Sequence, residues 1–163
     1  MRFGRIALAM LVLAAAPAFA HDWNDKNIAW QGLDEGLALA KKDKKPVCLI
    51  VYTEWCPHCG NFSKVFHDPK VVEKAKQFVM IHVDQDKEKE RTAGYAPDGG
   101  YIPRTLFLAS DGTLAADVHA PRPQYQYFYD EKDPASVLGG MDAALAKLAS
   151  GKPAAPTPEP KKP

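Results

Sequence analysis

Two apolar runs stand out in the middle of the chain, at residues 47–52 and at residues 78–83, where His82 is the one polar side chain. Both are rich in β-branched, aliphatic or aromatic side chains, and neither alternates between apolar and polar positions. Runs of this length and composition are typical of strands that are covered on both faces. We therefore predict two buried strands, of which residues 47–52 form the centre of a sheet.

Three stretches around these strands repeat their apolar residues at helical spacing. The first predicted helix spans residues 34–45. The second begins at Cys56, because Pro57 suits the first turn of a helix. The third is short, is capped by Asp68 and ends at Lys76. The apolar positions that define the first two helices are Leu33, Leu37, Ala40, Phe62, Val65 and Phe66.

The C-terminal half predicts a hairpin and a closing helix. Residues 105–108 read as a strand, residues 110–112 as a tight turn, and residues 113–119 as the hairpin partner. Before them, residues 84–100 are charged and rich in turn formers, so we expect a surface connection. Asp133 and Pro134 open a final helix whose apolar stripe is Val137, Met141, Leu145 and Leu148. Alternating strands and helices indicate an α/β or α+β fold.

The first 20 residues have the pattern of a secretory signal peptide. Arg2 and Arg5 precede an apolar run at residues 6–16, and Ala18 and Ala20 are the small residues before the expected cleavage site. The run is shorter than the roughly 20 residues needed to span a bilayer. We therefore expect cleavage between Ala20 and His21 and a periplasmic or otherwise secreted protein without a membrane segment in its mature form.

Composition limits the possible functions. The 163 residues carry a formal charge of +1, which becomes −1 without residues 1–20, so no electrostatic signal indicates nucleic-acid binding. Five of the 14 prolines fall in the last 12 residues, which predicts a disordered tail at residues 151–163 after one domain at residues 21–150. All three cysteines lie in that domain, and an odd number argues against a purely structural disulfide framework.

The motif Trp55-Cys56-Pro57-His58-Cys59 lies where the first buried strand gives way to a helix. Cysteines three positions apart share one face of the first turn and can alternate between dithiol and disulfide. The helix N-terminus favours the thiolate of Cys56, which we expect to attack, whereas Cys59 is expected to be more buried and to resolve mixed disulfides. Pro57 and His58 tune the pair, since a positive charge on His58 would stabilise the reduced form and make the disulfide more oxidising.

Other uses of these cysteines are less favoured. A zinc site usually has a second paired motif, and the remaining candidates, Cys48, His67 and His82, lack ligand-like spacing. We therefore predict no metal and no cofactor. A purely structural disulfide would be unusual at an exposed helix start. Cys48 lies in the middle of a strand, which predicts a buried, inert thiol.

A second signal is Tyr101-Ile102-Pro103, just before the strand at residues 105–108. Proline restricts Ile102 to extended geometry, and a cis bond here would turn the backbone toward the cysteines. A trans proline at the start of an edge strand is the alternative.

Together the two motifs resemble the thioredoxin superfamily over roughly residues 28–149. Residues 98–104, 106–108 and 124–129 resemble the anterior-gradient group of the endoplasmic reticulum. Residues 52–83 are similar to the C-terminal domain of the DsbD electron carriers, and the Pro57-His58 dipeptide is the one found in DsbA oxidases. The resemblance implies an α/β thioredoxin-like fold, with a central mixed sheet flanked by helices, and Pro103 in cis.

One position departs from that superfamily. Many members carry a buried acid six residues before the attacking cysteine to move a proton to or from the buried thiol, and this chain has Ile50 there. Glu54 is nearer but is expected at the surface, and the substitutes for the acid are water or the lysines of the helix at residues 41–45. We therefore expect modest turnover.

The sequence thus predicts an exported thiol–disulfide oxidoreductase that exchanges disulfides with protein substrates and favours oxidase or isomerase chemistry. Trp55, Pro57, Tyr101, Ile102 and Pro103 would contact an extended substrate backbone, and a redox partner would recharge the pair. The alternatives are a periplasmic reductant, a copper-binding module, or a thioredoxin-like chaperone or adaptor that holds clients through the aromatic segment 125–129.

Overall fold

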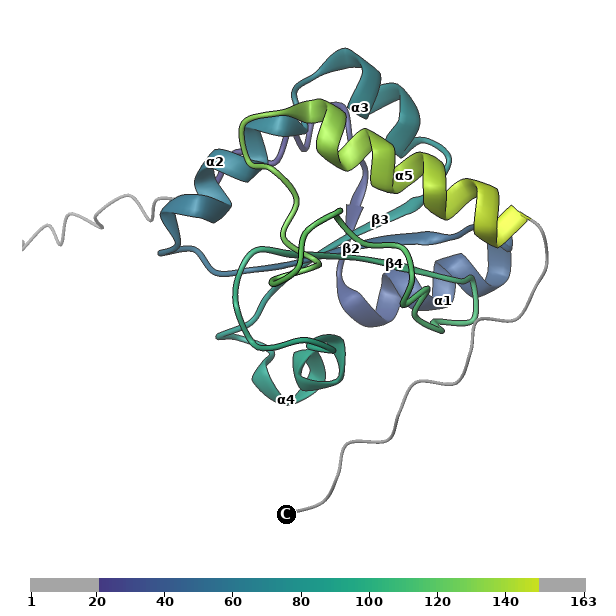
Figure 1. Ribbon diagram of the computed structural model, residues 1–163. Helices are drawn as coiled ribbons and strands as arrows, with labels where there is room; N and C mark the ends of the chain where they lie inside the picture. The colour runs from purple at the N-terminus through teal and green to yellow at the C-terminus, as the bar shows by residue number, and fades with distance from the viewer. Residues whose placement is uncertain (1–20, 150–163) are drawn as a thin grey trace, which may run out of the picture.

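The computed structural model describes residues 21–149, which form a four-stranded sheet with helices on both faces (Figure 1). In the sheet, β1 and β2 lie on either side of β3 and run parallel to it, and β4 pairs antiparallel with β2. The strand order is therefore β1-β3-β2-β4, with β2 in the interior. The strands are β1 Trp30–Gln31, β2 Val47–Tyr52, β3 Val79–Asp84 and β4 Arg104–Leu108.

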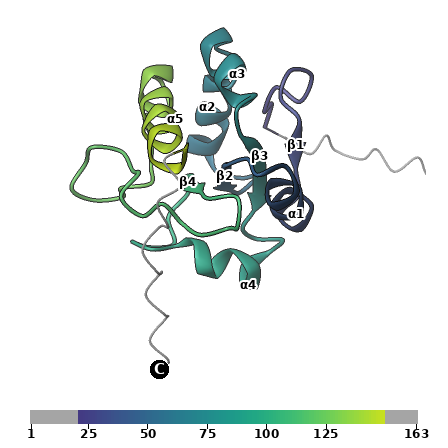
Figure 2. The same cartoon turned by 90° about the vertical axis from the view of Figure 1, so that its right-hand side faces the viewer.

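Helices cover the two faces of the sheet unequally. Figures 1 and 2 show α2, α3 and α5 together on one face, with α1 and α4 on the other. The helices are α1 Leu33–Asp43, α2 Pro57–Val65, α3 Pro69–Ala75, α4 Lys89–Thr92 and α5 Pro134–Ala149, and a 3-10 turn, η1, spans Ala93–Tyr95.

Strand β2 supplies side chains to two separate apolar clusters because consecutive strand residues point to opposite faces. Cys48 and Ile50 belong to the cluster beneath α2, α3 and α5, which also contains Cys56 and Cys59. Val47, Leu49 and Val51 belong to the cluster on the α1 side. Every residue of β2 is buried, which confirms the prediction of a central strand covered on both faces.

Most of the predicted elements are confirmed with shifts of one or two residues at their ends. The helix at Cys56 begins at Pro57, the short helix after Asp68 ends at Ala75, and Asp133 accepts the N–H of Ala135 at the start of α5.

The predicted hairpin forms at its turn, where the Ala109 N–H donates to the Thr113 carbonyl at 2.8 Å, but its partner strand does not extend to residue 119. Only one bridge, between Leu108 and Leu114, joins it to β4. At the other end of β4, the N–H of Thr105 donates to the carbonyl of Tyr127 at 2.8 Å. The later aromatic segment therefore occupies the edge that a longer hairpin would need.

The connection at residues 84–100 also differs from the expectation. Asp84 is a buried strand residue at the end of β3, and the segment contains α4 and η1, which sequence spacing did not predict. The predicted signal peptide at residues 1–20 and the tail at residues 151–163 lie outside the described residues. No helix among residues 21–149 has the length and hydropathy needed to cross a membrane.

Candidate active site

Cys56 and Cys59 lie at the junction of β2 and α2. Cys56 is the N-cap of α2, with φ −81° and ψ 115°, and its Sγ accepts the backbone N–H of Cys59 at 3.4 Å. Cys56 retains 4% exposure and Cys59 none, which is the order expected from their places in the helix. The two thiols therefore occupy one helical turn, with the outer one closer to solvent.

The environment of Cys59 disfavours its thiolate. Burial raises the pKa of the Cys59 thiol well above its usual range, and the neighbouring Cys56 and the charge of Glu131 act in the same direction. A backbone hydrogen bond from Thr53 lowers the pKa but does not offset burial. Cys59 thus stays protonated in the reduced protein, which is the state expected of a resolving thiol before a mixed disulfide forms.

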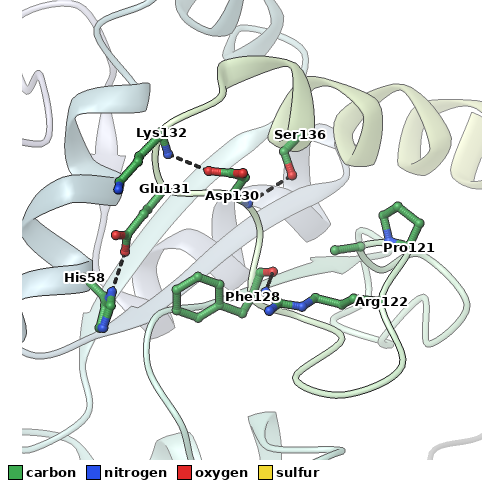
Figure 3. Close-up of a pocket in the computed structure, with 9 residues that line it drawn as sticks. His58, Pro121, Arg122, Phe128, Asp130, Glu131, Lys132 and Ser136 are labelled. Atoms are coloured by element: carbon green, nitrogen blue, oxygen red, sulfur yellow. Dashed lines mark hydrogen bonds and ion pairs between the residues drawn. The ribbon is translucent and has the colours of Figure 1, made fainter.

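His58 is held by an acid that the sequence did not reveal. Its Nδ1 lies 2.7 Å from Oε2 of Glu131, and its ring meets Phe128 edge-on at 5.9 Å between centroids (Figure 3). Asn61 donates to the other oxygen of Glu131 at 3.1 Å. Glu131 comes from the loop before α5, and no spacing rule connects it with His58, 73 positions earlier.

Two exposed apolar rings adjoin Cys56 in the sequence. Trp55 is 70% exposed, and its Nε1 donates to Asp86 Oδ2 at 2.6 Å. Pro57 is exposed, and Ile102 packs against the apolar cluster that contains both cysteines. The Ile102–Pro103 peptide bond is cis. An exposed indole ring therefore precedes Cys56, and an exposed proline ring follows it.

Tyr101 and Arg104 fix the segment that leads into β4. The Tyr101 hydroxyl donates to the Asp98 carboxylate at 2.7 Å and accepts the N–H of Tyr127 at 2.9 Å. Arg104 is 1% exposed and donates to the carbonyls of Tyr95 and Tyr101 and to the side-chain oxygen of Gln85. These contacts hold the residues before β4 in one conformation.

A cavity of about 590 Å³ opens beside His58 (Figure 3). Arg122 lies over the Phe128 ring at 5.2 Å and donates to the Phe128 carbonyl at 2.8 Å. Lys132 and Glu131 also line the cavity, so it presents both charges and an aromatic face next to the redox motif.

Position 50, six residues before Cys56, carries an apolar side chain instead of a buried acid. Ile50 is fully buried. Glu54 is half-buried, contrary to the expectation of a surface residue, because the Tyr52 hydroxyl donates to it at 3.0 Å. The proposed lysine carriers are exposed, and Lys41 and Lys42 belong to α1, on the opposite face of the sheet from α2 (Figure 2). They cannot take the proton of Cys59.

The remaining candidate ligands do not converge. Within residues 21–149, no group of three or more His, Cys, Asp or Glu side chains could hold a metal ion. Cys48 is fully buried, and burial raises its thiol pKa well above the usual range. His82 stacks on Trp30 and Tyr52, and His67 meets Asp22 at the surface. Burial thus separates Cys48 from solvent, as the prediction of an inert thiol requires.

Comparison with known proteins places this geometry in a family. A family model described as thioredoxin-like matches residues 29–110. The chain belongs to the thioredoxin-like family. It is 32% identical over 127 residues to the human anterior gradient protein 2 homolog, covering 77% of this chain and 71% of that relative. It is 30% identical over 139 residues to anterior gradient protein 3 of Xenopus tropicalis, covering 83% and 82%.

Solved structures of other proteins share this fold. A thioredoxin from Thermus thermophilus superposes with a TM-score of 0.58 at 21% identity, over 77% of this chain and 94% of that one. The structure described as DsbH oxidoreductase gives a TM-score of 0.55 at 18% identity, over 85% and 95%. The thioredoxin-like fold that the sequence predicted is thus confirmed.

Proposed function

We propose that this thioredoxin-like chain is an exported thiol–disulfide oxidoreductase that exchanges disulfides with protein substrates through Cys56 and Cys59. The observation that carries the proposal is the pairing of a slightly exposed cysteine at a helix N-terminus with a fully buried one a turn later. Similarity to the anterior gradient proteins supports the assignment.

The exchange proceeds in two balanced steps. Cys56 thiolate attacks a substrate disulfide, forms a mixed disulfide and releases one substrate thiolate, which takes up a proton. Cys59 then loses its proton and attacks Cys56 Sγ, which forms the Cys56–Cys59 bond and releases the second substrate thiol. Two electrons pass to the substrate. The reverse sequence delivers a disulfide to a reduced substrate and leaves the pair as a dithiol.

Substrate contact falls on the surface around the pair. Trp55, Pro57 and Tyr101 supply apolar contacts, and the segment at Ile102 and Pro103 pairs with extended substrate backbone. Main-chain pairing is independent of side-chain identity, so the enzyme accepts a broad range of unfolded or extended protein segments. A separate redox partner restores the pair after each cycle.

The direction of exchange favours oxidase or isomerase chemistry, with reduction as the alternative. The N-terminal end of α2 stabilises negative charge on Cys56, which favours the reduced state of the pair. Glu131 acts on a different step, because its carboxylate opposes ionisation of Cys59, which must lose its proton before it attacks Cys56. Residues 1–20 direct export, which places the pair in a compartment where disulfides persist.

The contribution of Glu131 can be isolated in a chain that lacks the histidine. In a His58→Gln background, Glu131→Gln removes only a negative charge near Cys59. Because Cys59 must lose its proton before it attacks Cys56, we expect the mixed disulfide to be resolved about threefold faster, as measured by stopped-flow kinetics. Glu73→Gln on α3, whose carboxylate binds Lys76, serves as the matched control. An unchanged rate of resolution would show that Glu131 does not act on Cys59.

The proposed function is tested by the reduction potential of the Cys56–Cys59 couple. A Cys48→Ser chain equilibrated in glutathione buffers reports one couple only. We expect a potential closer to DsbA, about −120 mV, than to thioredoxin, about −270 mV, together with reactivation of a scrambled disulfide protein. A value at the thioredoxin end would make the protein a reductant, and failure to form the disulfide would reject redox catalysis.

The aromatic segment at residues 125–129 exposes little surface that could hold clients, so it gives the chaperone alternative little support. Tyr127 and Tyr129 are buried, and only Tyr125 among these residues is largely exposed, at 53%. The segment mainly completes the core and the edge of β4. Client protection that survives replacement of both Cys56 and Cys59 would favour the chaperone over the oxidoreductase.

A further inference from the structure

His21, the first described residue, lies against the loop that leads into the redox motif. Its ring Nε2 donates to the carbonyl of Thr53 at 3.0 Å, and its backbone N–H donates to Glu54 Oε2 at 3.3 Å. The ring also packs near Tyr52, with 6.1 Å between centroids. A residue far from the cysteines in sequence thus binds the segment between β2 and Cys56.

The same ring contacts the chain on the other side of the cysteines. A Cβ atom at Gly60 would lie 2.9 Å from His21 Nδ1, so the ring rests directly on the backbone of α2. The absence of a side chain at position 60 permits this approach. His21 therefore touches the residue after Cys59 as well as the two residues before Trp55.

Thr53 connects His21 to both cysteines. Its carbonyl accepts the backbone N–H of Cys56 at 3.3 Å in addition to the His21 ring. Its backbone also makes the hydrogen bond that stabilises negative charge on Cys59. A displacement of Thr53 would consequently alter the surroundings of both sulfur atoms.

The backbone nitrogen of His21 is also the atom that signal-peptide removal would change. Hydrolysis of the Ala20–His21 bond consumes one water and leaves a carboxylate on Ala20 and an α-amino group on His21. That group is mainly protonated at neutral pH, since α-amino groups titrate near about 8. The new ammonium would face the Glu54 carboxylate, which the Tyr52 hydroxyl already holds at 3.0 Å.

We propose that His21 is a positioning residue for the redox loop, and that cleavage before it completes the site by placing an α-ammonium group against Glu54. The inference rests on the proposed function and on the predicted cleavage site. Charge-assisted hydrogen bonds are shorter and stronger than those between neutral groups, so the processed chain holds residues 53–54 more firmly than the unprocessed one.

The test uses four proteins: chains that begin at His21 or at Ala18, each with either Glu54 or the Glu54→Gln substitution. We expect the Ala18 form to melt about 2–4 °C lower in the reduced state. We also expect its glutathione equilibrium to shift at least twofold toward the disulfide, because a looser Thr53 supports the reduced pair less well. With Glu54→Gln, the chains that begin at His21 and at Ala18 should have the same melting temperature and the same glutathione equilibrium. Equal differences in both backgrounds, or none in either, would overturn the proposal.

A side-chain comparison separates positioning from simple anchoring. His21→Ala should shift the glutathione equilibrium, whereas His67→Ala should not. His67 binds the carbonyl of Asp22, the residue after His21, at 3.2 Å but does not bind the redox loop. Equal shifts would reduce His21 to a general anchor. The melting comparison needs no redox activity, so a chain that fails to form the disulfide would refute the proposed function without affecting this part of the test.

Discussion

A Cys59→Ser chain should accumulate a mixed disulfide between Cys56 and its substrate, and its multiple-turnover activity should fall by about 100-fold or more. The attacking sulfur remains in place, but the buried thiol that resolves the intermediate is gone. A serine hydroxyl is nearly isosteric and cannot displace a sulfur from a disulfide. Cys56→Ser should abolish both the intermediate and the turnover, since the other two described thiols, Cys48 and Cys59, are fully buried.

Non-reducing electrophoresis with a model protein substrate measures the intermediate directly. Cys48→Ser is the control, because this thiol is fully buried in β2 and should leave both turnover and trapping unchanged. If Cys59→Ser retained turnover while Cys56→Ser trapped substrate, the roles of the two cysteines would be reversed. If neither variant trapped substrate, the exchange mechanism would be wrong.

The same cysteines illustrate what local sequence can predict. The strand before Cys56, the helix that starts at Pro57 and the deeper burial of Cys59 all follow from patterns within about 20 consecutive residues. These features depend on backbone hydrogen bonding and on apolar spacing, and both are determined by residues that lie close together in the sequence. The structure confirms them with end shifts of one or two residues.

Contacts between distant segments could not be predicted in this way. Glu131 reaches His58 only because the loop before α5 packs against α2, and His21 reaches Thr53 only because the first described residues fold back onto the sheet. The shortened hairpin has the same cause, since Tyr127 competes for the edge of β4 from 22 positions away. Each outcome depends on which of several segments gains the contact, and local propensity does not decide that.

The buried Arg104 should have the largest effect on stability among the residues around the site. Its guanidinium donates to the carbonyls of Tyr95 and Tyr101 and to the side chain of Gln85, so it joins three points of the segment between β3 and β4. Within residues 21–149, no acidic side chain lies within ion-pair distance of it. Its role is therefore to satisfy backbone and amide oxygens rather than to pair charges.

Arg104→Met should lower the free energy of unfolding by about 2–4 kcal/mol, because it keeps the apolar stem and leaves three acceptors without their donor. Urea denaturation measures this loss. Arg104→Lys should recover only part of it, since an ammonium lacks the planar fork that reaches three oxygens at once. A loss below about 0.5 kcal/mol for Met would mean that water replaces the guanidinium. A full recovery by Lys would mean that charge alone, and not the fork, holds Tyr101 and the residues before β4 beside the redox pair.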